Sequence, residues 1–264
     1  MLSSGTASML WLGFFLLSSL SLASLPWIFW VFLTGSILSE GINMLGLAYA
    51  YRNCDISMAY PLGRALPVLM VAAVTLIFGL GKTPSGTALC GMIVIFFGCI
   101  LLPLKHRQDF RWKTYCSKTS FFLFMIASGT TGYTILDSQA ERLLRSIGGV
   151  SPLMKTLFYI YMIETGLAVL LFFYVLPSRT ERAELKRLLR SPYPYLTGVC
   201  SSCAYVLILL AMGYVSNVSY IQAFRQMSLP LGVFAGIFFL KESPAPLKLA
   251  GVALIVLGLI MAAF

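Results

Sequence analysis

The sequence predicts an all-α polytopic membrane protein with about nine transmembrane helices in two inverted repeats, four helices plus five. Of its 264 residues, 59% are hydrophobic and only 11% are charged, whereas a soluble domain has roughly 25% charged residues. A membrane-spanning helix needs about 20 predominantly apolar residues. Nine segments of the chain meet this requirement: 7–24, 27–50, 57–79, 86–104, 119–138, 153–176, 193–214, 218–240 and 246–263.

The first two segments are expected to be membrane helices. Segment 7–24 has no charged residue, lacks a basic start and runs through Pro26 into the next apolar segment, so it does not fit a cleaved signal peptide. Segment 27–50 places Glu40 and Asn43 three residues apart, on one face of a helix. Because charged and polar groups are costly in hydrocarbon, that face is expected to point into the helix bundle.

The third segment carries Arg64 among apolar residues, with Tyr60 four residues earlier on the same helix face. An arginine at the centre of a membrane helix costs roughly 2.5–3.5 kcal/mol on insertion scales, so it is expected to face protein or a water-filled cavity. The eighth segment repeats the pattern with Arg225. Three polar neighbours of Arg225 would line the same cavity: Tyr220, Gln222 and Gln226. The structural alternative is a contact between helices that only holds the bundle together.

Three acidic residues lie inside the predicted spans. Glu40 belongs to the second segment, Asp137 to the fifth, which also contains Tyr133, and Glu164 to the sixth. As a purely structural network, the acids and the two arginines could neutralise one another in pairs. One carboxylate would be left over, and an unpaired acid in a low-dielectric environment is suited to reversible protonation.

Glycine pairs with the same spacing occur in two apolar segments. Gly91 and Gly98 lie in the fourth segment, and Gly251 and Gly258 lie in the last. Because glycine lets helix backbones approach closely, both segments are expected to pack tightly against neighbouring helices.

These glycines and the two arginines define an internal repeat, in which Arg64 corresponds to Arg225. A first half at 1–104 with four helices and a second half at 119–264 with five are predicted, joined by a basic linker at 105–118. Corresponding segments are five apart, as the third and the eighth are, and this odd offset gives them opposite orientations in the membrane, which is the inverted-repeat plan of many transporters.

The formal net charge is +10, but the Lys and Arg residues lie mainly in short loops between the spans. Loops on one side (52–55, 105–118 and 177–191) contain eleven of them, and the loops on the other side contain six. This asymmetry is typical of the positive-inside bias, so no nucleic-acid partner is expected and the N-terminus is predicted to lie inside. The predicted location is the plasma (inner) membrane of a prokaryote.

No catalytic, cofactor or metal site is predicted. His106 is the only histidine and lies in the basic linker, so a multi-histidine metal site is excluded. Cys200 and Cys203 form a CxxC motif within an apolar segment, where small-residue packing explains them better than redox chemistry. Neither a glycine-rich phosphate loop nor a nucleophile with its base is found, so the protein is not expected to be an enzyme.

The stretch at 50–70 reads AYRNCDISMAYPLGRALPVLM, and the second half adds GYTILD at 132–137 and VSYIQAFRQMSLPLGVFAGIFFLKE at 218–242. From about residue 27 onward, the chain resembles the EamA-type members of the drug/metabolite transporter (DMT) superfamily. The resemblance implies ten helices in two inverted repeats of five, around a central cavity that opens to one side at a time.

The chain departs from the family pattern in two places. The first helix of the first repeat is missing, so either the cavity is completed by lipid, a partner chain or a second copy in a homodimer, or the true start lies upstream. The family also has a glutamate after the third segment, as Glu242 follows the eighth segment here, whereas Gly81 and Lys82 stand at the matching place.

Three functions fit these residues. The first is a secondary-active or facilitative transporter that moves a small polar metabolite, anionic or zwitterionic, by alternating access. Arg64 and Arg225 would bind its charged group. The other expected binding residues are Tyr60, Asn43, Tyr133, Tyr220, Gln222 and Gln226. The residues expected to couple transport to a proton, or to balance charge, are Glu40, Asp137 and Glu164. The second function is a flippase for a lipid phosphate such as a polyprenyl phosphate, and the third is a non-transporting membrane scaffold.

Overall fold

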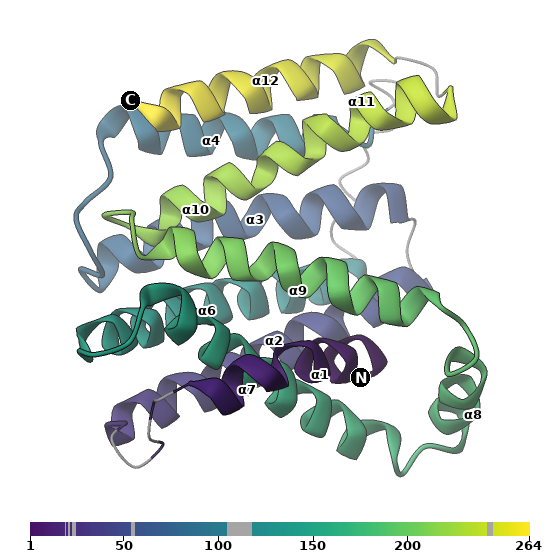
Figure 1. The fold of residues 1–264 in the computed structure, drawn as a ribbon. Coiled ribbons are helices and arrows are strands. Elements are labelled where there is room, and N and C mark those ends of the chain that lie inside the picture. Colours follow the sequence, from purple (N-terminus) through teal and green to yellow (C-terminus); the bar gives the residue numbers. More distant parts are fainter. Residues whose placement is uncertain (19, 21, 23–24, 54–55, 105–117, 242–244) are drawn as a thin grey trace. The chain divides into compact units, whose positions relative to one another are not determined.

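The computed structural model describes residues 1–264 apart from 19, 21, 23–24, 54–55, 105–117 and 242–244, and it leaves the side chains at 53–62, 118–119 and 240 outside the described residues (Figure 1). The described part is all-α, as predicted. Its helices are α1 (Leu2–Leu17), α2 (Trp27–Asn53), α3 (Ile56–Ile77), α4 (Gly86–Leu101), α6 (Lys118–Ser146), α7 (Pro152–Val175), α8 (Arg179–Leu188), α9 (Tyr193–Met212), α10 (Val218–Phe224), the 3-10 helix η3 (Arg225–Met227), α11 (Ser228–Leu240) and α12 (Pro246–Ala263).

Within the described residues, four helices are long and apolar enough to cross a membrane: α2, α7, α9 and α12. These helices indicate an integral membrane protein. Three of the predicted segments, 153–176, 193–214 and 246–263, coincide with helices to within two residues at either end. The total of nine spans and the inverted repeat remain predictions, and most of the predicted linker at 105–118 lies outside the described residues.

The first segment, predicted at 7–24, is the helix α1 at Leu2–Leu17, and the fifth, predicted at 119–138, extends as α6 to Ser146. Two further regions differ from the structure. The basic loop predicted at 177–191 contains the helix α8, whose N-terminus is capped by the Ser178 hydroxyl, which accepts a hydrogen bond from the backbone N–H of Glu181. The segment 218–240, predicted as one helix, is divided into α10, η3 and α11. Both differences arise from local backbone chemistry that an apolar-segment search ignores.

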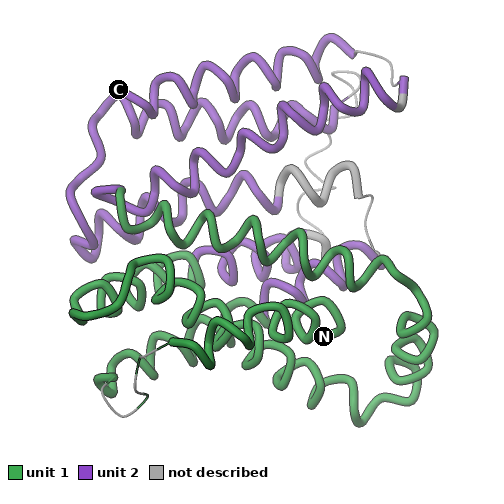
Figure 2. The backbone as a smooth tube through the Cα atoms, in the orientation of Figure 1, with its two compact units in different colours: residues 1–41, 132–214 green, residues 42–131, 215–264 purple. Residues whose placement is uncertain are grey.

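The chain divides into two compact units (Figure 2). Unit 1 comprises residues 1–41 and 132–214, and unit 2 comprises residues 42–131 and 215–264. The helices α2 and α6 each contribute to both units. Because the units are defined by packing and the predicted halves by sequence correspondence, the halves at 1–104 and 119–264 remain a prediction.

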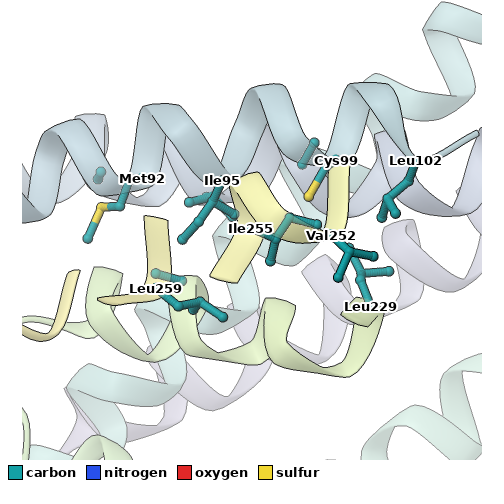
Figure 3. Close-up of a cluster of buried hydrophobic side chains, with 12 residues drawn as sticks. Met92, Ile95, Cys99, Leu102, Leu229, Val252, Ile255 and Leu259 are labelled. Carbon is teal, nitrogen blue, oxygen red and sulfur yellow. The ribbon is translucent and has the colours of Figure 1, made fainter. Parts of the chain in front are cut away.

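Unit 2 is built on close contact between α4 and α12. A Cβ added to Gly91 would lie 2.5 Å from the carbonyl oxygen of Gly258, and one added to Gly98 would lie 2.9 Å from that of Gly251. This confirms that the two glycine pairs support tight helix packing. Figure 3 shows side chains such as Ile95 of α4 gathered with those of α12 and α11 in a buried cluster. Its labelled members are Met92, Ile95, Cys99, Leu102, Leu229, Val252, Ile255 and Leu259.

Unit 1 is built on α1, α7 and α9. The Ser8 and Thr165 hydroxyl oxygens lie 2.7 Å apart, in hydrogen-bond contact between α1 and α7. The rings of Phe15 and Tyr161 stack with centroids 4.3 Å apart. At Gly198 of α9, an added Cβ would lie 2.4 Å from a backbone oxygen of α1. The first apolar helix is therefore an integral part of unit 1.

Candidate functional site

In unit 2, the side chain of Arg64 on α3 meets the start of α11. Its Nη1 atom donates a hydrogen bond to the Ser228 hydroxyl, which in turn donates to the backbone carbonyl of Arg225 at 2.9 Å. Arg64 is half-buried and Ser228 is exposed. One hydroxyl thus connects the side chain of the first predicted arginine with the backbone of the second.

A proline explains why the helix is interrupted at this place. Pro230 has no backbone N–H to donate to the carbonyl of Gln226 four residues earlier, and its ring crowds that carbonyl. The chain accordingly adopts a 3-10 turn at Arg225–Met227 before α11 begins. Interrupted membrane helices expose backbone polar groups, and transporters use such interruptions to bind substrates.

Two buried glutamines flank Arg225. Its Nη1 atom donates to Gln222 Oε1 at 3.5 Å, and Gln226 Nε2 donates to the backbone carbonyl of Gln222 at 3.1 Å. Gln226 is 1% exposed. Within the described part of the chain, Gln226 Oε1 has no hydrogen-bond donor. An unsatisfied buried acceptor beside an arginine suits a ligand that carries both a positive and a negative group.

Other predicted binding residues of unit 2 have contacts that hold the unit together. Asn43 is buried, and its Nδ2 atom donates to the Ile126 carbonyl at 3.0 Å and to the Thr130 hydroxyl at 2.7 Å. The Tyr220 hydroxyl accepts a hydrogen bond from the backbone N–H of Ser85 at 3.3 Å, at the N-terminus of α4. The side chain of Tyr60 lies outside the described residues.

In unit 1, Asp137 is 1% exposed and is surrounded by hydroxyl groups. Ser36 and Tyr159 donate to its Oδ1 atom, the latter at 2.8 Å, and Tyr205 donates to its Oδ2 atom. The Tyr133 ring lies edge-on to that of Tyr205, with centroids 6.0 Å apart. Asp137 of α6 therefore connects α6 with α2, α7 and α9. The sequence predicted Asp137 as a site residue but did not predict these hydrogen-bond partners.

A second buried acid, Glu141, follows Asp137 by one helical turn. It is 1% exposed, accepts a hydrogen bond from the Thr156 hydroxyl at 3.3 Å and lies 3.6 Å from the guanidinium of Arg145. No donor within the described residues reaches its Oε1 atom. Glu141 lies beyond the span predicted at 119–138 and was not predicted as a site residue, although a spacing of four from Asp137 signals a shared helix face.

The remaining predicted acids also belong to unit 1. Glu164 of α7 is 8% exposed and forms a side-chain hydrogen bond with Ser4. Glu40 of α2 is half-buried. The three predicted acids thus fall in unit 1 and the two predicted arginines in unit 2.

Two cations that were not among the predicted site residues donate hydrogen bonds to backbone carbonyls at helix ends in unit 1. Lys155 is 4% exposed, and its ammonium group donates to the carbonyls of Arg145 and Ile147 at the end of α6. Arg145 donates to the Leu210 carbonyl at 3.0 Å near the end of α9, with its guanidinium 5.3 Å from the ring centroid of Tyr214. Cations at helix C-termini stabilise the last carbonyls.

No protein-family model and no curated protein matches the chain. The resemblance to EamA-type transporters therefore rests on the motifs themselves. The main motif at 50–70 includes 53–62, where side chains lie outside the described residues.

Replacing Asp137 with asparagine is expected to lower the free energy of unfolding by about 1–3 kcal/mol. With the amide nitrogen in place of Oδ2, the Tyr205 hydroxyl loses the carboxylate oxygen to which it donates a charge-assisted hydrogen bond. Denaturant titration of the purified protein in detergent measures the change. In a Tyr205→Phe background the same substitution is expected to cost less, because the opposing hydroxyl is gone. Equal costs in both backgrounds would contradict this account.

Proposed function

We propose that the protein is a membrane transporter that moves a small anionic or zwitterionic metabolite by alternating access, secondary-active or facilitative, in the plasma membrane of a prokaryote. In this proposal it is an EamA-type member of the DMT superfamily with about nine spans in two inverted repeats. The observation that carries the proposal is that Arg64 donates a hydrogen bond to Ser228 at the interrupted helix, and Ser228 donates in turn to the backbone carbonyl of Arg225.

The chemistry of this cluster favours a carboxylate. The Ser228 hydroxyl is a neutral acceptor for Arg64, and charge-assisted hydrogen bonds to a carboxylate are roughly twice as strong as neutral ones. A substrate carboxylate would thus replace Ser228 as the partner of the guanidinium. The planar guanidinium can also bind both oxygens of the carboxylate at once.

The unsatisfied oxygen of Gln226 extends the argument to zwitterions. Its buried Oε1 atom can accept a hydrogen bond from a substrate ammonium group. Arg225, the neighbouring residue, would bind the carboxylate of the same molecule. An α-amino acid or a similar compact zwitterion supplies both groups.

Asn43 and Asp137 have a structural role in this proposal, because their polar atoms bond to neighbouring helices. Glu40 and Glu164 are the residues proposed to carry a coupling proton. Arg64 and Arg225 remain the residues that bind substrate.

A thermal-unfolding screen of the purified protein tests the proposal. The panel contains amino acids, organic acids, phosphorylated metabolites, cationic drugs and polyprenyl phosphates. A ligand present at about 100 times its Kd stabilises the folded state by about 2.7 kcal/mol, so a carboxylate ligand is expected to raise the unfolding temperature. Uptake of that compound into proteoliposomes then establishes transport.

The other outcomes of the screen each contradict the proposal. A shift with polyprenyl phosphates alone would indicate a flippase, which labelled-lipid scrambling in proteoliposomes would verify. A shift with cationic drugs alone would show that the arginines do not select the substrate. If no compound in the panel changes the unfolding temperature, the result would favour a non-transporting scaffold.

A further inference from the structure

An open apolar groove lies on unit 1, and its lining includes none of the residues proposed to bind substrate. It is formed mainly by α1 and α7 and has a volume of about 530 Å³. Its lining includes Leu2, Met9, Val169, Phe172 and Leu189. Because α7 is one of the helices able to cross a membrane, the groove would open toward the acyl chains of the bilayer.

The helix α8, which connects α7 with α9 (Figure 1), is amphipathic and basic. At 100° per residue, Leu185 and Leu188 lie about 60° apart on one side of α8, and Lys186 lies about 100° from Leu185, so that it flanks the apolar side. Residues 178–191 contain five Lys or Arg and two Glu. No residue of α8 is buried. A helix of this kind lies in the membrane interface with its apolar side toward the lipid.

The groove reaches the residue that directly follows α8 and caps its C-terminus. Leu189 lines the groove, Arg190 is the next residue, and Lys186 precedes Leu189 by three positions, within one turn. Both cationic side chains are exposed. An apolar groove whose lining residue Leu189 has cationic residues close by in the chain matches a molecule that has a long apolar chain and an anionic head.

We propose that this groove binds an anionic glycerophospholipid, with an acyl chain along α1 and α7 and the headgroup phosphate beside Lys186 and Arg190. Charge complementarity selects the occupant: the basic end of the groove attracts an anionic headgroup more strongly than a zwitterionic one. The same positive charge would oppose the approach of the α8 surface of a second copy. The site lies within unit 1 and does not depend on the transport proposal.

Native mass spectrometry of the full chain in mild detergent tests the headgroup contact. Phosphatidylglycerol and phosphatidylcholine are titrated separately, and adducts are quantified. Phosphatidylglycerol is expected to bind more tightly, and Lys186→Gln/Arg190→Gln is expected to weaken its binding by about tenfold or more. The matched control is Arg142→Gln/Lys82→Gln, which removes the same charge from two exposed residues elsewhere and is expected to bind as the wild type does.

A second pair of variants tests the groove itself. Ala168 lines it, so Ala168→Phe is expected to fill it and to remove the preference for phosphatidylglycerol. The control is Ala253→Phe at an exposed position of α12, where the added ring is expected to leave binding unchanged.

Three results would overturn the proposal. If Lys186→Gln/Arg190→Gln and its control bind equal amounts of phosphatidylglycerol, the bound lipid is only non-specific annular lipid. Unchanged binding in Ala168→Phe would place the lipid elsewhere. If the wild-type protein is a dimer and Ala168→Phe dissociates it, the occupant of the groove is a second copy of the chain. None of these measurements uses transport, so failure here is distinguishable from failure of the proposed function.

Discussion

Replacing Arg64 with alanine is expected to remove the thermal stabilisation by a carboxylate substrate and to lower its uptake at subsaturating concentration by about 30-fold or more. Truncating one partner of a hydrogen-bonded charge pair costs on the order of 2 kcal/mol or more, which corresponds to that factor. Uptake into proteoliposomes and the ligand-induced shift in unfolding temperature measure the effect. Arg64→Lys is expected to be intermediate, because it keeps the charge but loses the planar fork.

Two controls separate binding from structure in this experiment. Arg142→Ala removes an exposed arginine of unit 1 and is expected to leave uptake unchanged. Ser228→Ala removes the neutral acceptor of Arg64 without removing the guanidinium, so substrate binding is expected to persist. If Arg64→Ala is folded and transports normally, the arginine only connects α3 with α11 and the site assignment is wrong.

Replacing both Gly91 and Gly258 with alanine is expected to lower the free energy of unfolding by about 2–6 kcal/mol, on the basis of about 1–3 kcal/mol for each overpacked position. Each added Cβ would lie 2.5 Å from the carbonyl oxygen of the opposite glycine. Backbone atoms cannot rotate away as a side chain can, so α4 and α12 must separate. Denaturant titration in mixed micelles measures the loss.

The matched control for this pair is Gly86→Ala/Gly232→Ala. A Cβ added at either position meets no atom within 4 Å, and alanine is the better helix former. The control is therefore expected to be neutral or slightly stabilising. Equal destabilisation of both double variants would show that α4 and α12 are not in close contact.

Much of the helical architecture follows from apolar segments alone. The helices α7, α9 and α12 were predicted to within two residues, because long uninterrupted apolar runs have few alternative structures in a membrane. The helix α8 was missed because it is charged. A signal was nevertheless present: Ser178 with Glu181 three residues later is a capping box. Likewise, Pro230 signalled that the eighth segment would be interrupted.

The candidate site was predictable only in part. Arg64 and Arg225 stand out because a charge in an apolar segment requires a compensating environment. Asn43 and Tyr220 were expected in the same site, yet their polar atoms bond to helix α6 and to the start of α4. A polar residue on an inward face serves ligand binding and helix packing equally well, and only its partners distinguish the two roles.

The contact between α4 and α12 also has a consequence for biogenesis. The ribosome must add roughly 140 residues between the end of α4 at Leu101 and the start of α12 at Pro246, which takes about 7–30 s at about 5–20 residues per second. During that interval the glycine face of α4 lacks the helix against which it packs. Completion of unit 2 is therefore a late event in the synthesis of the chain.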